Sequence, residues 1–330
     1  MKAIFLCNNK KIFSKVYAPS VMKKIGGLCE CSEVMTKNEL KEKPELVSNA
    51  EYIFSTWGMP AFTEEEIRRY FPYLKIVFYA AGTVQAFAKP FLNLGIKVAS
   101  AWRANAVPVA EFAFAQILLA AKGYFLASKK AKFNRLGSHI YFNKMPGNYS
   151  VKVGLLGVGG VGSLVAEKLK TIDCEVFAYD PFLSDEKAEA LNVQRTSLEK
   201  IFSSCDVISN HLANKDELKG IINYGLLRTM KKTAVFINTG RGRQVKEWDL
   251  FHAMVFTRRT ALLDVTYPEV PLPFNPILYL KNIIISPHMA GSSGNEVVRM
   301  AEYMYDEFVR YVSGEPLLHE VTQKMLETMA

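Results

Sequence analysis

The chain has 330 residues, of which 49% are hydrophobic, and a formal net charge of +9. That length favours about two domains and is enough to bury a large core. The lysines are scattered, and no helix-turn-helix, zinc-finger or aromatic–basic pattern accompanies them. The charge therefore argues against a nucleic-acid partner and favours the steering of small anionic ligands.

The sequence also bears on membranes, compartment and metals. We expect no membrane span, because we find no apolar run of the roughly 18 residues that a span needs. The N-terminal stretch MKAIFLCNNKKIF is interpreted as a first β-strand, since polar residues interrupt its short apolar run. The five cysteines are odd in number, and the pair Cys29 and Cys31 has no partner pair that completes a zinc site. We predict reduced thiols in a cytoplasmic protein that holds no metal.

Strand and helix patterns alternate along the first part of the chain. Strands are predicted at residues 2–7, 51–56, 74–82 and 95–101. A helix at 63–71 has Thr63 as its N-cap, and Glu66 three residues later completes a capping box. Residues 105–125 are predicted to form a long helix that is apolar on most sides, which places it in a core or a subunit interface.

A second alternating series starts at residue 151. Strands are predicted at 151–156, 174–180, 206–212, 234–240, 260–265 and 282–286, and helices at 163–172, 197–205, 224–230, 247–255 and 295–314. The isoleucines at 283–285 indicate a strand buried on both faces. The alternation favours an α/β fold with parallel sheets.

A glycine-rich turn follows the first strand of this second series. Gly157, Gly159 and Gly162 have the G-x-G-x-x-G spacing, with a helix after them and Asp180 at the end of the next strand. In a dinucleotide site these glycines permit a tight turn, close approach of a pyrophosphate and close helix–strand packing. The carboxylate of Asp180 suits an adenosine ribose and repels a 2′-phosphate, which favours NAD over NADP. An unrelated glycine turn is the alternative.

Three later strands each end in a polar residue. They deliver Arg241, then Asp264 with Glu269, then His288. Taken singly, each has a simpler interpretation: Arg241 as a surface arginine, Glu269 as a solvated loop acid and His288 as a structural histidine. Together, at the ligand-binding edge of a parallel sheet, they suit reduction of a 2-keto acid. Arginine clamps a carboxylate, histidine gives a proton to the carbonyl oxygen, and glutamate favours and orients the imidazolium.

With these motifs in place, the sequence resembles the D-isomer-specific 2-hydroxyacid dehydrogenases along essentially its whole length. The stretches that carry the resemblance are GLLGVGGVG, AYDP, FINTGRGRQV, LLDVTYPE and SPHMAGSS, and DVTYPEVP resembles the glyoxylate/hydroxypyruvate reductase branch. The resemblance implies two doubly wound parallel-sheet domains. A Rossmann NAD-binding domain at 103–292 is inserted into a flavodoxin-like substrate domain at 1–102 and 293–330. It also implies a homodimer formed through the long helix and the loop after it.

The resemblance further implies roles for individual residues. His288 is the expected acid/base, Glu269 its partner and Arg241 the substrate anchor. Ala81, Gly82 and Trp57 are expected at the substrate, although Trp57 is equally suited to buried packing. The expected NAD-binding residues are Gly157, Gly159, Gly160, Val161, Gly162, Asp180, His211, Thr239, Gly240 and Asp264.

The sequence departs from the family pattern at two places. Gly240 stands where the family usually has Ala or Ser, which is expected to loosen the turn that aims Arg241. The strand-end motif YAAGTVQAF lacks the aspartate common a few residues after Gly82. These departures bear on which 2-keto acid is used rather than on the reaction type.

Other functions remain open at this level. An NADH-sensing, corepressor-like binding protein retains the same residues without turnover, and phosphite oxidation also suits a basic site. Formate oxidation is disfavoured, because formate enzymes of this family replace the glutamate with glutamine. An inactive homologue is disfavoured by the intact set of Arg241, Glu269 and His288.

Overall fold

The computed structural model describes residues 1–326 and divides into two compact units, Met1–Asn105 with Ser292–Ala330, and Ala106–Gly291. The first unit is thus built from both ends of the chain. The second is inserted between them. The predicted domains, 1–102 with 293–330 and 103–292, have limits within three residues of these, and their assignment to separate functions stays a prediction.

The first unit contains a parallel sheet of five strands, in the order β2-β1-β3-β4-β5. The strands are β1 (Lys2–Leu6), β2 (Glu30–Met35), β3 (Tyr52–Ser55), β4 (Ile76–Tyr79) and β5 (Lys97–Ser100). This 2-1-3-4-5 order is that of flavodoxin-like folds. Four of the five strands were predicted; β2 was not, because this edge strand reads ECSEVM and is only partly buried.

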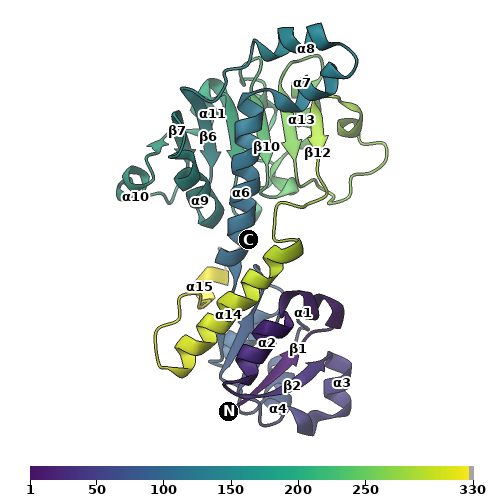
Figure 1. Ribbon diagram of the computed structural model, residues 1–330, viewed down its shortest axis with the longest axis vertical. Coiled ribbons are helices and arrows are strands. Elements are labelled where there is room, and N and C mark those ends of the chain that lie inside the picture. Colours follow the sequence, from purple (N-terminus) through teal and green to yellow (C-terminus); the bar gives the residue numbers. More distant parts are fainter. Residues whose placement is uncertain (327–330) are drawn as a thin grey trace. The chain divides into compact units, whose positions relative to one another are not determined.

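Helices cover both faces of the five-stranded sheet. They are α1 (Lys10–Val16), α2 (Pro19–Gly26), α3 (Lys37–Glu42), α4 (Glu64–Tyr70), α5 (Ala88–Asn93), α14 (Val297–Val312) and α15 (Gln323–Leu326), with short 3-10 turns at Pro44–Leu46 and Gly294–Glu296. Helices α1, α2 and α14 pack on one face of the sheet, and α3, α4 and α5 pack on the other (Figure 1). The predicted capping box of Thr63 and Glu66 at the start of α4 is confirmed.

The second unit contains a parallel sheet of seven strands, in the order β12-β11-β10-β9-β6-β7-β8. The strands are β6 (Val151–Leu156), β7 (Cys174–Tyr179), β8 (Gln194–Arg195), β9 (Val207–Asn210), β10 (Val235–Asn238), β11 (Thr260–Leu263) and β12 (Ile283–Ile285). The chain order reverses between β6 and β9, as in a Rossmann fold. The predicted α/β class with two doubly wound parallel sheets is confirmed.

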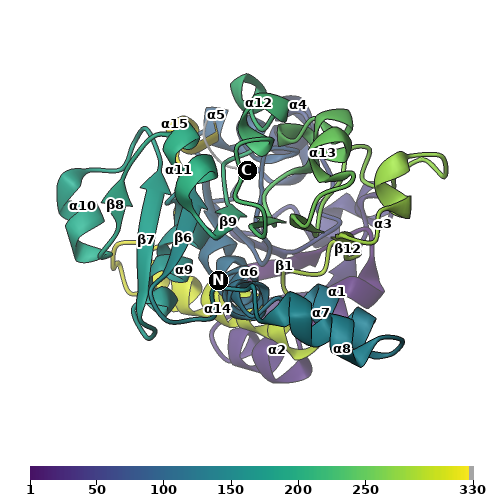
Figure 2. The ribbon, with the colours of Figure 1, turned by 90° about the horizontal axis from the view of Figure 1, so that it is seen from above.

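Helices also cover both faces of this sheet. They are α6 (Trp102–Ala121), α7 (Tyr124–Ala131), α8 (Arg135–Phe142), α9 (Gly160–Leu169), α10 (Asp185–Ala190), α11 (Leu198–Ser204), α12 (Tyr224–Leu227) and α13 (Glu247–Met254), with 3-10 turns at Asp216–Leu218, Gly242–Gln244 and Pro276–Tyr279. Helices α6 and α9 pack on one face and α11, α12 and α13 on the other (Figure 2).

Two expectations about apolar segments need correction. Strand β12 is the edge of its sheet, so Ile284 and Ile285 are only partly buried rather than enclosed on both faces. Helix α6 does meet the length and composition of a membrane span, although half of its most apolar window is buried within the structure. It begins at Trp102, three residues earlier than predicted, and ends at Ala121 rather than at residue 125, because Gly123, at a φ of +66°, separates it from α7.

A buried carboxylate fixes the segment that follows α14. Glu307, 1% exposed, accepts hydrogen bonds from the backbone N–H groups of Leu318 (3.0 and 3.1 Å) and His319 (3.0 Å). The backbone N–H of Ser100 in β5 then donates to the carbonyl of His319 at 3.0 Å. One side chain therefore ties the returning chain to the five-stranded sheet.

We expect Glu307→Leu to lower the free energy of unfolding by about 2 kcal/mol, because it leaves buried backbone donors without an acceptor. Urea unfolding followed by circular dichroism measures the change. Glu302→Leu, an exposed position on the same helix, is the matched control and should change stability by less than about 0.5 kcal/mol. Equal losses in the two variants would contradict the assigned role of the buried carboxylate.

Candidate active site

The ends of six parallel strands form one row in the seven-stranded sheet. Backbone pairing aligns Tyr179, Leu156, Asn210, Asn238, Leu263 and Ile285, the last residues of β7, β6, β9, β10, β11 and β12. Ligands of open α/β sheets bind beyond this edge. Every predicted site residue of the second unit lies in the loops that leave this row or in the first turn of α9.

The glycine turn has the geometry expected of a dinucleotide site. Gly157 adopts a φ of +85°, a conformation that other residues rarely take. A Cβ on Gly162 would lie 2.0 Å from the carbonyl oxygen of Gly157, so only glycine permits this packing of helix on strand. A Cβ on Gly159 would meet nothing within 4 Å, which leaves open space beside the backbone. Gly160 and Val161 begin α9, whose N-cap residue supplies no capping side chain.

Asp180 is oriented by the backbone around it. Its Oδ2 accepts from the N–H of Val158 at 2.8 Å, and its Oδ1 accepts from the N–H of Phe182 at 2.8 Å. The carboxylate is thus held next to the glycine turn with lone pairs left for further donors. The donor-rich turn, the open space at Gly159 and this acceptor suit the pyrophosphate and ribose of NAD.

His211 lies beside the same turn, as a neutral ring. Its Nε2 is 2.9 Å from Ser209 Oγ and its Nδ1 is 3.1 Å from Thr239 Oγ1. Burial lowers the pKa of His211 to about 4, since removal from water disfavours the imidazolium. The ring therefore connects β9 to β10 through two hydroxyl groups.

Asp264 anchors the loop that carries His288. It is 2% exposed, and its Oδ1 accepts from Ser286 Oγ (2.6 Å) and the N–H of Met289 (2.9 Å). Its Oδ2 accepts from the N–H of Ala290 at 2.9 Å. The role predicted for Asp264, a contact to the nicotinamide carboxamide, stays a prediction. The loop-anchoring contacts were not foreseen, because they pair residues 22–26 positions apart.

His288 and Glu269 form a pair outside the sheet. His288 Nδ1 is 2.5 Å from Glu269 Oε1, and the side chains are 52% and 57% exposed. His288 adopts a φ of +51°, an uncommon conformation for a residue with a side chain. Because Nδ1 is engaged by the carboxylate, Nε2 is the ring nitrogen left for a substrate.

Arg241 lies near this pair in a tight turn. Its guanidinium NH1 donates to the carbonyl of Gly240 at 2.9 Å. Burial lowers the pKa of Arg241, while the Glu269 carboxylate opposes that shift. A Cβ on Gly242 would lie 2.0 Å from the carbonyl oxygen of Thr266, so this turn packs directly against the loop after β11. The structure thus brings Arg241, Glu269 and His288 together.

Three predicted substrate residues belong to the other unit. Trp57 follows β3 and is 36% exposed, and its carbonyl accepts from Cys7 Sγ at 3.2 Å. Ala81 and Gly82 follow β4, and their carbonyls accept from Ser100 Oγ at 2.9 and 2.6 Å. Their proposed contact with substrate stays a prediction.

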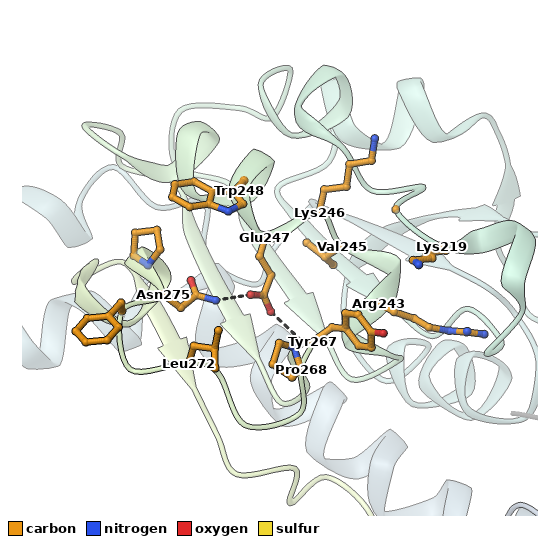
Figure 3. A pocket seen from close by; sticks show the side chains of 13 residues that line it. Lys219, Arg243, Val245, Lys246, Glu247, Trp248, Tyr267, Pro268, Leu272 and Asn275 are labelled. Atoms are coloured by element: carbon orange, nitrogen blue, oxygen red, sulfur yellow. Dashed lines mark hydrogen bonds between the residues drawn. The ribbon is translucent and has the colours of Figure 1, made fainter.

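A pocket of about 650 Å³ lies in the second unit, beside the loops that follow β10 and β11 (Figure 3). It is lined by Arg243, Lys246, Trp248, Tyr267, Leu272 and Phe274, among others. Glu247 lies within it, and its carboxylate accepts from the N–H of Tyr267 and from Asn275 Nδ2. Arg241, Glu269 and His288 are not among its lining residues, so we place the candidate chemistry elsewhere.

Within residues 1–326, no cluster of three or more His, Cys, Asp or Glu side chains suits a metal ion. All five cysteines are free thiols.

The low pKa of His211 predicts a pH-dependent stability. The unfolded chain binds a proton at this residue below about pH 6.5, whereas the folded chain does so only near pH 4. The contribution of His211 to the free energy of unfolding is therefore fully present above pH 6.5. It is lost as the pH falls toward 4, and its upper limit is about 3 kcal/mol.

Urea unfolding at pH 5 and pH 7 tests this expectation. His211→Gln should flatten the difference in stability between the two pH values. His252→Gln, at an exposed position on α13, is the matched control and should leave that difference unchanged. If both variants retain the full pH dependence, another group is responsible for it.

Comparison with known proteins agrees with the geometry. Residues 114–290, more than half of the chain, match the family described as "D-isomer specific 2-hydroxyacid dehydrogenase, NAD binding domain". A D-3-phosphoglycerate dehydrogenase of Archaeoglobus fulgidus is 31% identical over 71% of this chain and 44% of its own length. A glyoxylate reductase of Aeropyrum pernix is 31% identical over 68% of each chain.

The chain thus spans less than half of the Archaeoglobus relative. Among solved structures, a phosphoglycerate oxidoreductase from Rhizobium etli aligns with a TM-score of 0.81 at 20% identity, covering 98% of this chain and 99% of that one. That likeness establishes the shared fold. The match to an NAD-binding domain confirms the predicted cofactor, NAD. The chain therefore belongs to the D-isomer-specific 2-hydroxyacid dehydrogenase family.

Proposed function

We propose that this protein is an NAD-dependent oxidoreductase that interconverts a small 2-keto acid and the corresponding D-2-hydroxy acid. The observation that carries the proposal is the pairing of His288 with Glu269 at 2.5 Å, beside Arg241. This set lies at the same sheet edge as the glycine turn of the dinucleotide site. Family membership supports the reaction type.

In this proposal bound NADH supplies the hydride that reduces the substrate carbonyl. His288 holds a proton on Nε2 and delivers it to the carbonyl oxygen. Glu269 fixes the ring through Nδ1 and stabilises the imidazolium before transfer. Thr266 Oγ1 donates to the carbonyls of Pro268 (3.0 Å) and Glu269 (2.9 Å) and so orients the backbone that carries the carboxylate.

Arg241 is the proposed anchor for the substrate carboxylate. Its guanidinium is only partly exposed, so it keeps its charge in surroundings that strengthen an ion pair. One donor is occupied by the carbonyl of Gly240, and the remaining donors suit bidentate binding of a carboxylate. The substrate contacts expected of Ala81, Gly82 and Trp57 from the family resemblance are retained as proposals of their own.

The proposed substrates are glyoxylate or hydroxypyruvate. The similarity to a glyoxylate reductase and the DVTYPEVP stretch support this choice. Phosphohydroxypyruvate is a second candidate, since D-3-phosphoglycerate dehydrogenases are similarly related. Two alternatives remain, an NADH-sensing protein without turnover and a phosphite-type oxidation. An assay of NADH absorbance with 2-keto acids distinguishes both from the proposed reductase.

We also propose a cytoplasmic homodimer. Helices α7 and α8 and the turn between them present large apolar side chains to solvent, with Phe133 93%, Leu136 73% and Ile140 54% exposed. Apolar surface of this kind in a single chain marks an interaction site. The occupant proposed here is a second copy of the chain.

The first expected outcome is loss of NADH absorbance with a panel of 2-keto acids. The panel contains glyoxylate, hydroxypyruvate, phosphohydroxypyruvate, pyruvate and bulkier branched or aromatic acids, and NADPH is the cofactor control. His288→Ala should lower kcat at least about a hundredfold while leaving NADH binding intact, because it removes the proton donor. Glu269→Gln should lower kcat less than His288→Ala does.

His252→Ala, at an exposed histidine on α13, is the matched control and should retain full activity. Unchanged turnover in His288→Ala would refute the assigned role. Tight NADH binding without turnover on any acid would favour the sensor, and NADH formation from phosphite would favour that oxidation.

The proposed dimer predicts a mass of twice 37.1 kDa in light scattering after size-exclusion chromatography. Leu136→Asp should shift the protein toward monomer, because it buries a charge in the proposed interface. Phe274→Asp, which changes a side chain that is 91% exposed in the loop after β11, is the control and should leave the mass unchanged. A wild-type monomer at micromolar concentration would refute the dimer.

A further inference from the structure

Three buried side-chain amides form a network behind the turn that carries Arg241. Asn210, Asn238 and Gln244 are each 0% exposed. Asn210 Nδ2 donates to Asn238 Oδ1 at 2.9 Å and to Gln244 Oε1 at 2.7 Å. Buried amides cost free energy unless they are hydrogen-bonded, and here they satisfy one another. The network therefore joins the ends of β9 and β10 to the 3-10 turn Gly242–Gln244.

The same amides hold the backbone on both sides of Arg241. Gln244 Oε1 accepts from the N–H of Arg241 at 3.2 Å, and Asn238 Oδ1 accepts from the N–H of Gly240 at 3.1 Å. Asn238 Nδ2 also donates to the carbonyl of Arg241 at 3.4 Å. The direction in which the arginine leaves the turn thus depends on the placement of two amide groups.

The network is also tied to the loop after β9. Gln244 Nε2 donates to the carbonyls of Leu212 (3.1 Å) and Ala213 (2.8 Å), and Asn210 Oδ1 accepts from the N–H of Leu212 (3.2 Å). Both the amide nitrogen and the amide oxygen of Gln244 are therefore engaged. An apolar side chain of similar length would leave these backbone groups unpaired.

Gly240 fits this network through its lack of a side chain. A Cβ at this position would lie 2.9 Å from both Asn210 Nδ2 and Gln244 Oε1, closer than real Cβ contacts. The φ of Gly240 is not in the left-handed region, so backbone conformation alone does not demand glycine here. The space that the Cβ of an Ala or Ser would occupy is taken by the two amides.

We propose that Asn210, Asn238 and Gln244 are positioning residues for Arg241, and that Gly240 is required because the amides of Asn210 and Gln244 fill the space beside it. The inference deepens the proposed function, since it rests on Arg241 as the carboxylate anchor. Far from loosening the turn, Gly240 permits an amide network that fixes it. Glycine thus stands at the position where the family usually has Ala or Ser, because here the polar side chains of Asn210 and Gln244 occupy the space of a Cβ.

The first test separates substrate binding from cofactor binding. In Gly240→Ala and in Gln244→Met, the KM for the best 2-keto acid should rise roughly tenfold or more, because Arg241 is misaligned with the carboxylate. In Gln244→Met, which alters no expected NAD-binding residue, the Kd for NADH measured by fluorescence titration should change much less. If these residues only stabilised the core, the variants would have a lower melting temperature, and the KM for the 2-keto acid would not rise more than the Kd for NADH.

A matched control distinguishes positioning from general loss of a hydrogen-bonded side-chain amide. Asn282 Nδ2 donates to the carbonyls of Met254 (2.9 Å) and Arg259 (2.8 Å), just before β12 begins and thus at the opposite end of the strands. Asn282→Ala should lower stability and leave the KM for the 2-keto acid unchanged. Equal effects on KM from Asn282→Ala and Gln244→Met would overturn the proposal.

The second test measures the steric link directly. Gly240→Ala should raise KM strongly in the wild-type background and by less than about twofold when Asn210→Ala and Gln244→Ala are already present, because neighbouring changes are not additive. The same fold-change in both backgrounds would overturn the link. So would a Gly240→Ala enzyme with unchanged KM.

A structural readout keeps the inference independent of turnover. If the wild-type protein reduces no 2-keto acid, the proposed function fails, and crystal structures of wild type and Gly240→Ala then decide the positioning role. Displacement of the Arg241 guanidinium from the Gly240 carbonyl in the variant supports it. An unmoved Arg241 overturns it.

Discussion

The hydrogen-bonded register of the seven-stranded sheet is the constraint on which the candidate site depends. Parallel pairing places Leu156, Asn210, Asn238, Leu263 and Ile285 in one row. Each following loop therefore starts from the same edge, although Gly157 in the first of these loops and His288 in the last are 131 positions apart in the chain. A slip of one residue in the pairing of any strand would turn its side chains to the opposite face of the sheet. The residues that follow that strand would then no longer reach the candidate site.

Beyond this row, short buried contacts hold the loops and so fix where their individual side chains lie. Asp264 ties the loop of His288, the Asn210–Gln244 pair ties the turn of Arg241, and Gly242 packs on Thr266 between them. These contacts are largely removed from water, where an unpaired polar group is costly. The loops are consequently held by groups that do not themselves perform the proposed chemistry.

The sequence predicted the parts of this arrangement that follow from local pattern. Buried parallel strands are continuous apolar runs, so their ends, and hence Asp180, Arg241 and His288, were located without coordinates. The contacts that aim those residues were not predicted. Gln244 and Asn210 are 34 positions apart, and only the register of β9 and β10 shows that they meet. The edge strand β2 was missed because its residues are largely polar.

The His288–Glu269 pair is difficult to explain as a contribution to stability. Both side chains are more than half exposed, and ion pairs in that setting contribute roughly 0–1 kcal/mol. His288 also has a backbone conformation that costs a residue with a side chain of order 1 kcal/mol. Within its own unit the pair therefore adds little or nothing to the free energy of unfolding. Buried Asp264, by contrast, holds the loop that carries His288 in place. A rigidly supported yet exposed histidine–carboxylate pair, with Nε2 free of the carboxylate, is the arrangement that proton transfer to a bound substrate requires.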